Sequence, residues 1–401
     1  MFKTGIELND CAGCYACIYA CPKKCFSESF DKDGFFYPKF DPASCIDCKI
    51  CESVCPASEK NSEKIKNAPL SANAFINANK EDLKKSSSGG AFTAIAKIFC
   101  DGNYAIFGAK YDGKSKVWHD YIEDISQIDV FRKSKYLQSD VGNSYILARD
   151  FLKQGKKVIF TGTPCQIAAL KLFLKKDYEN LLTLDLSCYG INNSKLVESY
   201  LGDLENFYGK KIISYSFREK HSKFLSKSPS FSKITFEDGK SKYEAFDLLY
   251  RGFISSLFKR EGCYNCKYVD SQRVSDFTLA DFWGIRELDG SLTDKNGCSL
   301  LLVNTEKAAK MANVLKNFGA FKEFPLQDAV RRNYPLAKRG PSKIHPLREE
   351  FLLAARERGM LFALNKYVPK KIFWHRLAYF AARFMPNKLR TKWLKFFRLI
   401  D

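Results

Sequence analysis

The stretch that decides the fold is Cys11-Ala-Gly-Cys-Tyr-Ala-Cys-Ile-Tyr-Ala-Cys-Pro22, together with its repeat Cys45-Ile-Asp-Cys-Lys-Ile-Cys-Glu-Ser-Val-Cys-Pro56. Each copy places four cysteines in a Cys-x2-Cys-x2-Cys-x3-Cys-Pro run, and the copies lie 34 residues apart, cysteine for cysteine. This spacing is typical of bacterial two-cluster ferredoxins, in which three cysteines of each run hold one [4Fe-4S] cube and the fourth holds the other. The sequence therefore predicts a small iron–sulfur module near the N-terminus.

The spacing also predicts which cysteines share a cluster. The expected ligand sets are Cys11, Cys14, Cys17 and Cys55 for one cluster, and Cys45, Cys48, Cys51 and Cys21 for the second. Two-residue gaps let one short loop supply three corners of a cube, and the proline after the fourth cysteine ends that loop. Zinc is the alternative, but zinc ribbons use two separated Cys-x2-Cys pairs per ion rather than four cysteines in one run. A disulfide framework is weaker still.

Length and composition describe a globular protein with two or three domains, because the chain has 401 residues of which 45% are hydrophobic. No apolar run reaches 18 residues, so no transmembrane helix is expected. The first residues, MFKTGIELND, contain no apolar signal segment. Fifteen cysteines in such a chain indicate a reducing cytoplasm and metal ligation.

The formal net charge of +20 invites a nucleic-acid interpretation, which we do not favour. Each four-thiolate cluster adds a charge of about −2, and ten Lys and Arg residues against one Asp are concentrated in 366–401. That tail is also aromatic and helical in period, over 373–384 and 389–400. It predicts peripheral contact with an anionic membrane, or equally a helix that packs on the chain's own body.

Downstream of the cysteine runs, short apolar segments alternate with helical patterns, which is typical of an α/β domain. We expect a ferredoxin domain over 1–60, a polar linker over 61–71, a mixed α/β and α+β domain over 72–335, and a basic helical region over 336–401. The predicted strands are 74–78, 104–111, 117–122, 158–160, 181–186, 212–217, 231–236, 242–246, 277–280 and 300–304, with a hairpin over 34–40. The predicted helices are 91–100, 141–154, 164–176, 194–208, 248–259 and the region from about 346.

Four further cysteines stand where a site is expected. Cys165 and Cys188 each follow a predicted strand, and Cys263 and Cys266 form a Cys-Tyr-Asn-Cys pair. Because sites in open α/β sheets collect at the carboxyl ends of strands, these four could meet and hold a third [4Fe-4S] cluster. A zinc site, or simple packing without metal, fits the spacing equally well. Cys165 as a catalytic nucleophile is a weaker third interpretation, because no histidine lies near it in sequence. Cys25, Cys100 and Cys298 stand alone.

Two glycine-containing turns could hold phosphate groups. Ser86-Ser-Ser-Gly-Gly90 opens a predicted helix, and Thr161-Gly-Thr-Pro164 joins a strand to a helix. Glycines let the backbone approach an anion, while serine hydroxyls and helix N–H groups bind it. From these residues alone, an ordinary helix cap is the stronger interpretation of the first turn. Lys133 and Lys135 could add positive charge to the same anion.

With these residues in view, the chain resembles the coenzyme F-420 hydrogenase/dehydrogenase beta subunit family, in the form that carries a two-cluster ferredoxin. The carriers are Ser87-Ser-Gly-Gly90, Lys135-Tyr-Leu-Gln138, Phe160-Thr-Gly-Thr-Pro-Cys-Gln166, Cys188-Tyr-Gly190, Arg251-Gly-Phe253, Cys263-Tyr-Asn-Cys266 and Ser275-Asp-Phe-Thr-Leu-Ala-Asp-Phe-Trp-Gly284.

The resemblance implies FAD beside a [4Fe-4S] cluster, and it favours a cluster over zinc at the four downstream cysteines. The implied FAD-binding residues are Ser87, Ser88, Gly89, Gly90, Lys135, Thr161, Gly162, Thr163 and Asp281. The family commonly has Cys-His-Gly where this chain has Cys188-Tyr189-Gly190, so no role of that histidine carries over. Similar single-chain members are found among surface-polysaccharide biosynthesis proteins.

These observations lead to one hypothesis and its rivals. We expect a flavin and iron–sulfur oxidoreductase that exchanges single electrons with a ferredoxin-like protein and acts on a small organic substrate. The alternatives are an electron-transfer subunit of a larger complex, a coenzyme F-420 oxidoreductase, and a nucleic-acid-binding protein with structural metal.

Overall fold

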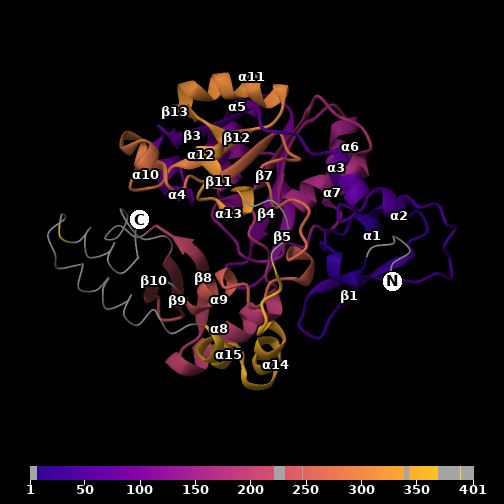
Figure 1. The fold of residues 1–401 in the computed structure, drawn as a ribbon, viewed down its shortest axis with the longest axis vertical. Coiled ribbons are helices and arrows are strands. Elements are labelled where there is room, and N and C mark those ends of the chain that lie inside the picture. Colours follow the sequence, from indigo (N-terminus) through magenta and orange to yellow (C-terminus); the bar gives the residue numbers. More distant parts are fainter. Residues whose placement is uncertain (1–6, 221–230, 246, 338–342, 369–388, 390–401) are drawn as a thin grey trace.

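The cysteine runs fold around a small antiparallel hairpin. The structure is a computed structural model that describes residues 7–220, 231–245, 247–337, 343–368 and 389. Strand β1 (Phe26–Phe30) pairs with β2 (Phe36–Phe40), while α1 (Ala16–Ala20) and α2 (Ile50–Ser53) each begin inside one cysteine run. The hairpin is the expected one, although its first strand was not predicted. Figure 1 shows this domain at one side of the molecule, beside α6 and α7.

An eight-stranded mixed sheet forms the centre of the larger domain, in the order β13-β3-β12-β11-β7-β6-β4-β5. The strands are β3 (Ser71–Asn77), β4 (Tyr104–Tyr111), β5 (Val117–Ile122), β6 (Lys157–Gly162), β7 (Leu181–Leu186), β11 (Phe277–Asp281), β12 (Ser299–Val303) and β13 (Gly319–Phe324). The four central strands β11, β7, β6 and β4 are parallel, and the outer pairs are antiparallel. Because β12 is antiparallel to both β11 and β3, strand β3 points the same way as the parallel set.

This directionality gathers the expected site at one edge. The segments that follow β3, β6, β7 and β11 all leave the sheet at its carboxyl edge, where ligands bind in open α/β sheets. The first three segments carry Ser86–Gly90, Cys165 and Cys188, and Asp281 is the last residue of β11. Residues far apart in the chain therefore meet because of strand direction alone.

Helices cover both faces of the sheet, because strand residues alternate between two apolar cores. On β6, Val158 and Phe160 join the core under α6 (Ser144–Lys153) and α7 (Pro164–Leu174). Ile159 joins the opposite core, under α5 (Ala91–Phe99) and α11 (Glu306–Leu315). The first core also contains Tyr15 and Phe36 of the ferredoxin domain, so that domain shares its interior with the larger one.

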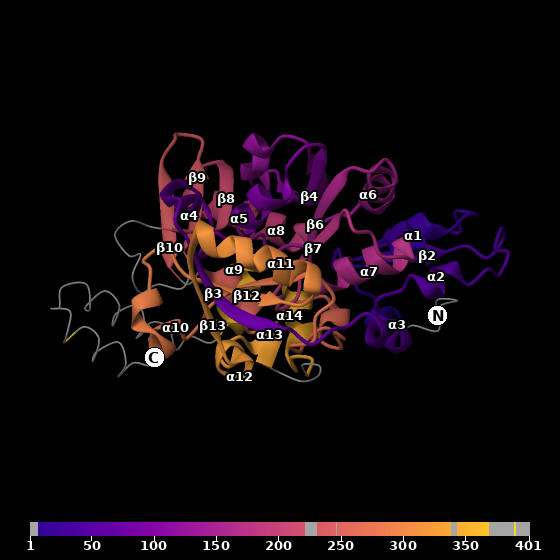
Figure 2. The ribbon, with the colours of Figure 1, turned by 90° about the horizontal axis from the view of Figure 1, so that it is seen from above.

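A second, smaller body packs below the sheet in Figure 1. It combines the antiparallel strands β8 (Ile212–Glu219), β9 (Phe231–Phe236) and β10 (Ser241–Ala245) with α8 (Ser194–Tyr208), α9 (Leu248–Ile254), α14 (Arg348–Arg358) and α15 (Met360–Tyr367). Seen from above in Figure 2, the strands β8 to β10 and the ferredoxin domain lie on opposite sides of the sheet. The remaining helices are α3 (Glu59–Lys64), α4 (Lys80–Lys85), α10 (Ile285–Leu288), α12 (Leu326–Val330) and α13 (Tyr334–Ala337).

Three expectations need correction or restriction. The segment 61–71 is not irregular throughout, because α3 continues to Lys64 and Asn67 exchanges backbone hydrogen bonds with Arg273. The helix predicted over 248–259 ends at Ile254, and Ser256 has a left-handed backbone with φ of 62°. The predicted tail helices over 373–384 and 389–400 lie outside the described residues, apart from the exposed Leu389. No described helix has the length and apolar character needed to span a membrane.

Candidate iron–sulfur and cofactor sites

The two cysteine runs share an unusual backbone geometry. Gly13 and Tyr15 in the first run both have φ of 64°, and Asp47 and Lys49, the matching positions of the second run, have φ of 54° and 55°. Left-handed backbone at three residues other than glycine is strained, and such strain concentrates at ligand-binding loops. The sequence repeat is therefore a repeat of loop conformation.

The first ligand set comes together in the structure across the two runs. Burial raises the pKa of the Cys14 thiol well above its ordinary value, and the nearby Cys55 and Cys17 thiols raise it further. Burial also raises the pKa of Cys55 to about 12, with Cys11 among the contributing charges. Thiols of this kind stay protonated on their own, whereas coordination to iron deprotonates them. Cys55 of the second run thus lies with Cys11, Cys14 and Cys17, as the predicted crossover requires.

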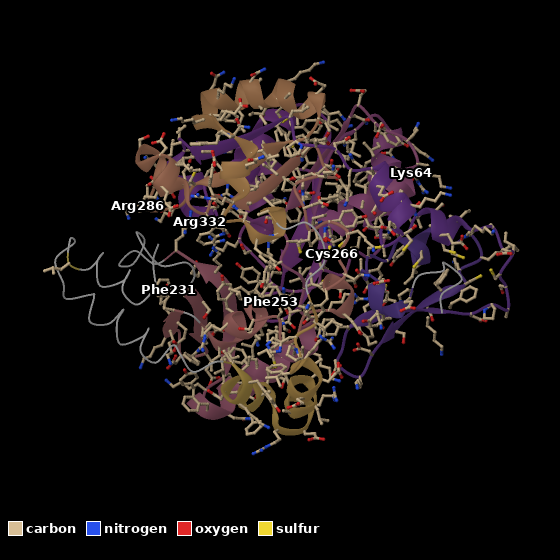
Figure 3. The ribbon with its side chains drawn as sticks, viewed as in Figure 1. Lys64, Phe231, Phe253, Cys266, Arg286 and Arg332 are labelled. Carbon is tan, nitrogen blue, oxygen red and sulfur yellow. The ribbon has the colours of Figure 1, made fainter. Side chains whose placement is uncertain are left out.

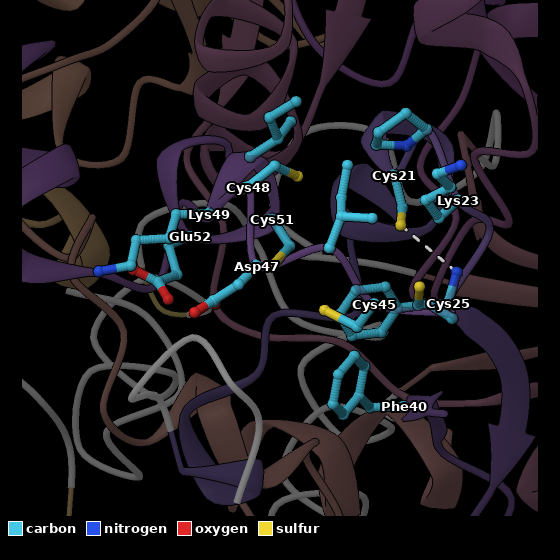
Figure 4. Close-up of a pocket in the computed structure, with 14 residues that line it drawn as sticks. Cys21, Lys23, Cys25, Phe40, Cys45, Asp47, Cys48, Lys49, Cys51 and Glu52 are labelled. Carbon is cyan, nitrogen blue, oxygen red and sulfur yellow. Dashed lines mark hydrogen bonds between the residues drawn. The ribbon is translucent and has the colours of Figure 1, made fainter. Parts of the chain in front are cut away.

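The second ligand set lines a single small pocket, shown in Figure 4. Cys21, Cys45, Cys48 and Cys51 all line it. The pocket also contains Cys25, whose backbone N–H donates to Cys21 Sγ at 3.3 Å, so this residue does not stand alone. Cys48 is exposed, which places this site at the outer side of the domain.

The four downstream cysteines also meet, at the carboxyl edge of the sheet. All four line one cavity of about 580 Å³. Burial raises the pKa of Cys165 to about 11 and of Cys188 to about 12, and the Cys263 thiol adds to both shifts. Burial raises the pKa of Cys266 as well, and the thiols of Cys165, Cys263 and Cys188 raise it further. Each of the four is thus within electrostatic reach of at least two others.

The donor set fits an iron–sulfur cluster chemically, since Cys thiolates are its usual ligands. Within the described ranges, no group of three or more His, Cys, Asp or Glu side chains is placed to hold a single metal ion. The cysteine groups are defined instead by their shared cavities and mutual charges. Which metal group they hold stays a prediction.

The same cavity receives most of the implied FAD-binding residues. Those that line it are Ser87, Ser88, Gly90, Lys135, Thr161, Gly162, Thr163 and Asp281. Gly89 does not line it: its backbone lies against β3, where an added Cβ would come within 2.1 Å of Phe75 O. Gly89 therefore lets the turn pass close to the strand. Asp281 forms an ion pair with Arg218, so its carboxylate is already engaged.

The cavity is suited to an anionic cofactor at its Ser86–Gly90 end. Lys135 also lines the cavity, and its ammonium donates to Phe131 O and Arg132 O at 2.9 Å. Burial lowers the pKa of Lys135 to about 7, and Lys133 lowers it further. An anion beside this lysine would restore its positive charge. Gly90, with φ of 81°, is the N-cap of the nine-residue helix α5, and the helix N-terminus lies at the cavity wall because Gly90, Ala91 and Phe92 line the cavity.

Two cavity residues, His119 and Ser139, have no signal in the sequence. His119 Nε2 lies 3.0 Å from Thr161 O, a carbonyl that can only accept, so Nε2 carries the proton. Nδ1 then accepts from the Ser139 hydroxyl at 2.6 Å. Because His119 belongs to no recognisable motif on strand β5, the sequence could not have identified it.

We expect His119 to make stability depend on pH. Burial lowers its pKa to about 4, below the unfolded value of about 6.5, so only the unfolded chain gains a proton between these values. Its stabilising contribution is present above pH 6.5 and is lost as the pH falls. Between pH 7 and pH 5 the wild type should lose about 2 kcal/mol more unfolding free energy than His119→Gln, measured by urea denaturation. Parallel pH profiles of the two proteins would contradict this assignment.

The first ligand set faces the downstream cysteines across the domain junction. The Tyr268 hydroxyl donates to Pro56 O at 2.7 Å, directly after Cys55. Burial raises the pKa of Tyr268, and the thiols of Cys165, Cys266, Cys14 and Cys55 raise it further, so this ring lies between the two groups. In Figure 3, Cys266 lies beside the ferredoxin domain. The set with the exposed Cys48 is therefore outermost, and the first set is next to the cavity.

Comparisons with known proteins match both parts of the chain. The family described as the C terminus of the coenzyme F-420 hydrogenase/dehydrogenase beta subunit matches residues 155–329. The family described as 4Fe-4S dicluster domain matches residues 10–58. The first match contains all four downstream cysteines, and the second contains both cysteine runs.

Individual relatives match mainly the N-terminal domain. The protein named Ferredoxin 7Fe from Hydrogenibacillus schlegelii is 36% identical over 70 residues, covering 18% of this chain and 81% of that protein. An uncharacterised protein from an intergenic region of Porphyra purpurea is 39% identical over 56 residues, covering 13% of this chain and 71% of its own length. Among solved structures, a chain of the F-420-reducing [NiFe] hydrogenase complex from Methanosarcina barkeri aligns with a TM-score of 0.45 and 17% identity. That alignment covers 77% of this chain and 94% of the other.

Proposed function

We propose a flavin-dependent function for this chain. Through residues 155–329 the chain belongs to the coenzyme F-420 hydrogenase/dehydrogenase beta subunit family, and it also carries a dicluster domain. The protein is an iron–sulfur electron-transfer oxidoreductase, and we propose that it binds FAD and a third [4Fe-4S] cluster. FAD, when bound, exchanges single electrons with clusters and pairs of electrons with an organic substrate. The observation that carries the proposal is the single cavity lined by four cysteines and by the Ser86–Gly90 turn.

Different residues of the cavity would bind the phosphates of FAD and the cluster. The Ser86–Gly90 turn, the start of α5 and Lys135 would bind the phosphates at one end. Cys165, Cys188, Cys263 and Cys266 would hold a cluster at the other end. The Thr161–Thr163 turn lies between them, since the Thr163 hydroxyl is 3.1 Å from Cys165 Sγ. A flavin ring near this turn would lie next to its electron source.

The protonated Nε2 of His119 holds the Thr161 carbonyl, and the Ser139 hydroxyl is fixed by Nδ1. These bonds orient the turn rather than supply a proton, because each hydrogen is already donated within the pair and its carbonyl. The arrangement therefore supports a binding role for this side of the cavity.

The outer side of the ferredoxin domain would receive electrons from, or return them to, a ferredoxin-like redox partner. The exposed Cys48 supports this docking side, since it brings the second ligand set close to solvent. The substrate is proposed to be a small organic molecule, with a cytoplasmic role in surface-polysaccharide biosynthesis. A coenzyme F-420 oxidoreductase and an electron-transfer subunit without a substrate of its own are the alternatives.

The test is composition after strictly anaerobic purification. Three cube clusters and one flavin predict about twelve irons, about twelve sulfides and one FAD per chain. Iron and sulfide would be measured chemically, and flavin by its absorbance after release from the protein. Eight irons and one FAD per chain would contradict the third cluster. Twelve irons per chain without flavin would contradict the proposed FAD. Reduction of a small molecule by the isolated chain would exclude the pure electron-transfer subunit.

A further inference from the structure

Arg260 is a buried cation at the junction of the ferredoxin domain and the cavity. Its side chain is fully buried, at 0% exposure. Nε donates to Cys11 O at 2.6 Å and Nη1 donates to Gln138 Oε1 at 3.2 Å, while the guanidinium lies 4.3 Å from the centroid of the Tyr37 ring. Its contacts therefore reach into the loop of the first cysteine run.

The approach between the two parts is close. Gly13 leaves no room for a side chain, because an added Cβ would lie 2.9 Å from Arg260 Cζ and 2.2 Å from Gln138 Nε2. Gly262 likewise packs against Cys11 O, at 2.6 Å from where its Cβ would be. The loop that bears Cys11 and the loop that bears Cys263 thus touch through backbone, with the guanidinium between them.

Among the described residues, Arg260 has no carboxylate as a counter-charge. Within the part of the chain that the structure describes, no carboxylate forms an ion pair with it, and its Nη2 is buried without a hydrogen-bond partner. A buried charge costs several kcal/mol unless it is paired. Arg273, which is also buried, does have a counter-charge, because its Nη2 lies 3.1 Å from Asp185 Oδ2.

Groups of cysteines lie on either side of Arg260 and would supply these anions once clusters are bound. One is the set of Cys11, Cys14, Cys17 and Cys55, whose loop accepts from Arg260. The other is the downstream set, where the charge of Arg260 opposes the rise in pKa that burial causes at Cys165 and Cys263. A four-thiolate [4Fe-4S] site carries about −2, and reduction adds one further negative charge.

We propose that Arg260 is the shared counter-charge of two cluster sites, raising the reduction potential of both. This rests on the third cluster of the proposed function. A fixed cation between two sites favours the more negative, reduced state of each, and burial keeps its field from being screened by water. The outer site of Cys21, Cys45, Cys48 and Cys51 shares no contact with Arg260 among the described residues, so it serves as an internal reference.

The test is a redox titration of the full chain, followed by electron paramagnetic resonance. In Arg260→Gln we expect two of three one-electron midpoints to fall, each by at least a tenfold change in the reduction equilibrium, which is about 59 mV for a one-electron couple. The third midpoint should stay. Arg260→Lys keeps the charge and should shift no midpoint by that much. Arg348→Gln is the matched control, because Arg348 is buried nearby against the Tyr264 ring but already pairs with Glu349.

Unchanged midpoints in a fully loaded Arg260→Gln, or an equal fall of all three, would overturn the proposal, because the residue would then be structural only. If Arg260→Gln fails to bind iron, Arg260→Lys becomes the deciding variant. Full iron content with unshifted midpoints in Arg260→Lys supports the role of charge. Loss of iron, or a change in the reduction equilibrium above tenfold, refutes it. Eight irons per chain, with a single midpoint that falls in Arg260→Gln, would reject the third cluster and the shared role. Arg260 would then act on the first ligand set alone. Twelve irons without a shift would reject the inference and leave the proposed function intact.

Discussion

Replacing Cys165 with alanine should remove about a third of the iron, from about twelve to about eight atoms per chain, and leave the ferredoxin clusters in place. The residue lies in the first turn of α7, which follows β6, and its thiol lies within electrostatic reach of Cys263. A [4Fe-4S] cube is held by four thiolates, so we expect the site to empty when one of them is removed. The eight cysteines of the N-terminal runs are untouched by the change.

The same variant should still bind flavin but no longer reduce it through the ferredoxin domain. We expect the rate of flavin reduction by a reduced ferredoxin to fall at least about a hundredfold, since even outer-shell changes at metal sites cost 10–100-fold. Iron analysis and stopped-flow flavin absorbance would measure the two effects. Cys100→Ala is the control, because Cys100 follows α5 away from all three cysteine groups.

The outcome also separates the alternatives. One zinc per chain that disappears in Cys165→Ala, with eight irons in both proteins, would establish the zinc interpretation. Equal iron and equal flavin reduction in both proteins would mean that Cys165 is a packed residue.

Replacing Arg273 with methionine should cost about 3–5 kcal/mol of unfolding free energy, because it leaves the buried Asp185 without its counter-charge. The two side chains are 1% and 0% exposed, with Nη2 and Oδ2 3.1 Å apart. Neither carboxylate oxygen has an aligned hydrogen bond to a partner, so the attraction is one of charge. Burial raises the pKa of Asp185 even with Arg273 opposing that rise.

Arg273 also ties the cavity walls together. Its guanidinium donates to Tyr268 O, Asp270 O and Leu186 O, two residues before Cys188. The loss of stability should therefore be accompanied by loss of iron from the downstream site. Urea denaturation of the anaerobic protein would measure the free energy, and iron analysis the occupancy.

Two further variants make this prediction specific. Arg273→Met with Asp185→Leu should recover a large part of the loss, since removing both buried charges removes the imbalance. Lys85→Met, which breaks the exposed pair with Asp129, should cost less than about 1 kcal/mol. The cost of Arg273→Met should shrink as the pH falls, because a protonated Asp185 is neutral. A cost no larger than that of Lys85→Met would contradict the argument.

Much of the fold could be predicted because its strands are buried and apolar. Strands β4, β5, β7 and β9 and helix α8 begin and end where the pattern predicts. Strand β13 was missed, because Gly319–Phe324 has largely exposed or half-buried residues at the sheet edge and carries little apolar alternation.

The candidate site was predictable only where a motif marks it. Spacing singled out the cysteines, and strand direction then brought Cys165 and Cys188 to the cavity. His119 and Arg260 could not be foreseen, since each is a single polar residue whose role depends on contacts with segments distant in the chain. The end of α9 was misplaced for a related reason: the left-handed Ser256 turns the chain toward the junction, and no residue letter encodes that turn.

The crossover of Cys55 and Cys21 has a consequence for how the N-terminal domain forms. With the proposed ligand sets, each cluster ties a residue of one run to residues of the other, so each closes a loop that spans the hairpin between them. Such closure removes conformational entropy from the unfolded chain, as a disulfide does. The first set cannot be completed until Cys55 has been synthesised, whereas the second set is complete once Cys51 has been synthesised. The two proposed clusters therefore cross-link the ends of the same hairpin twice, so the two runs stay joined even when one cluster is lost.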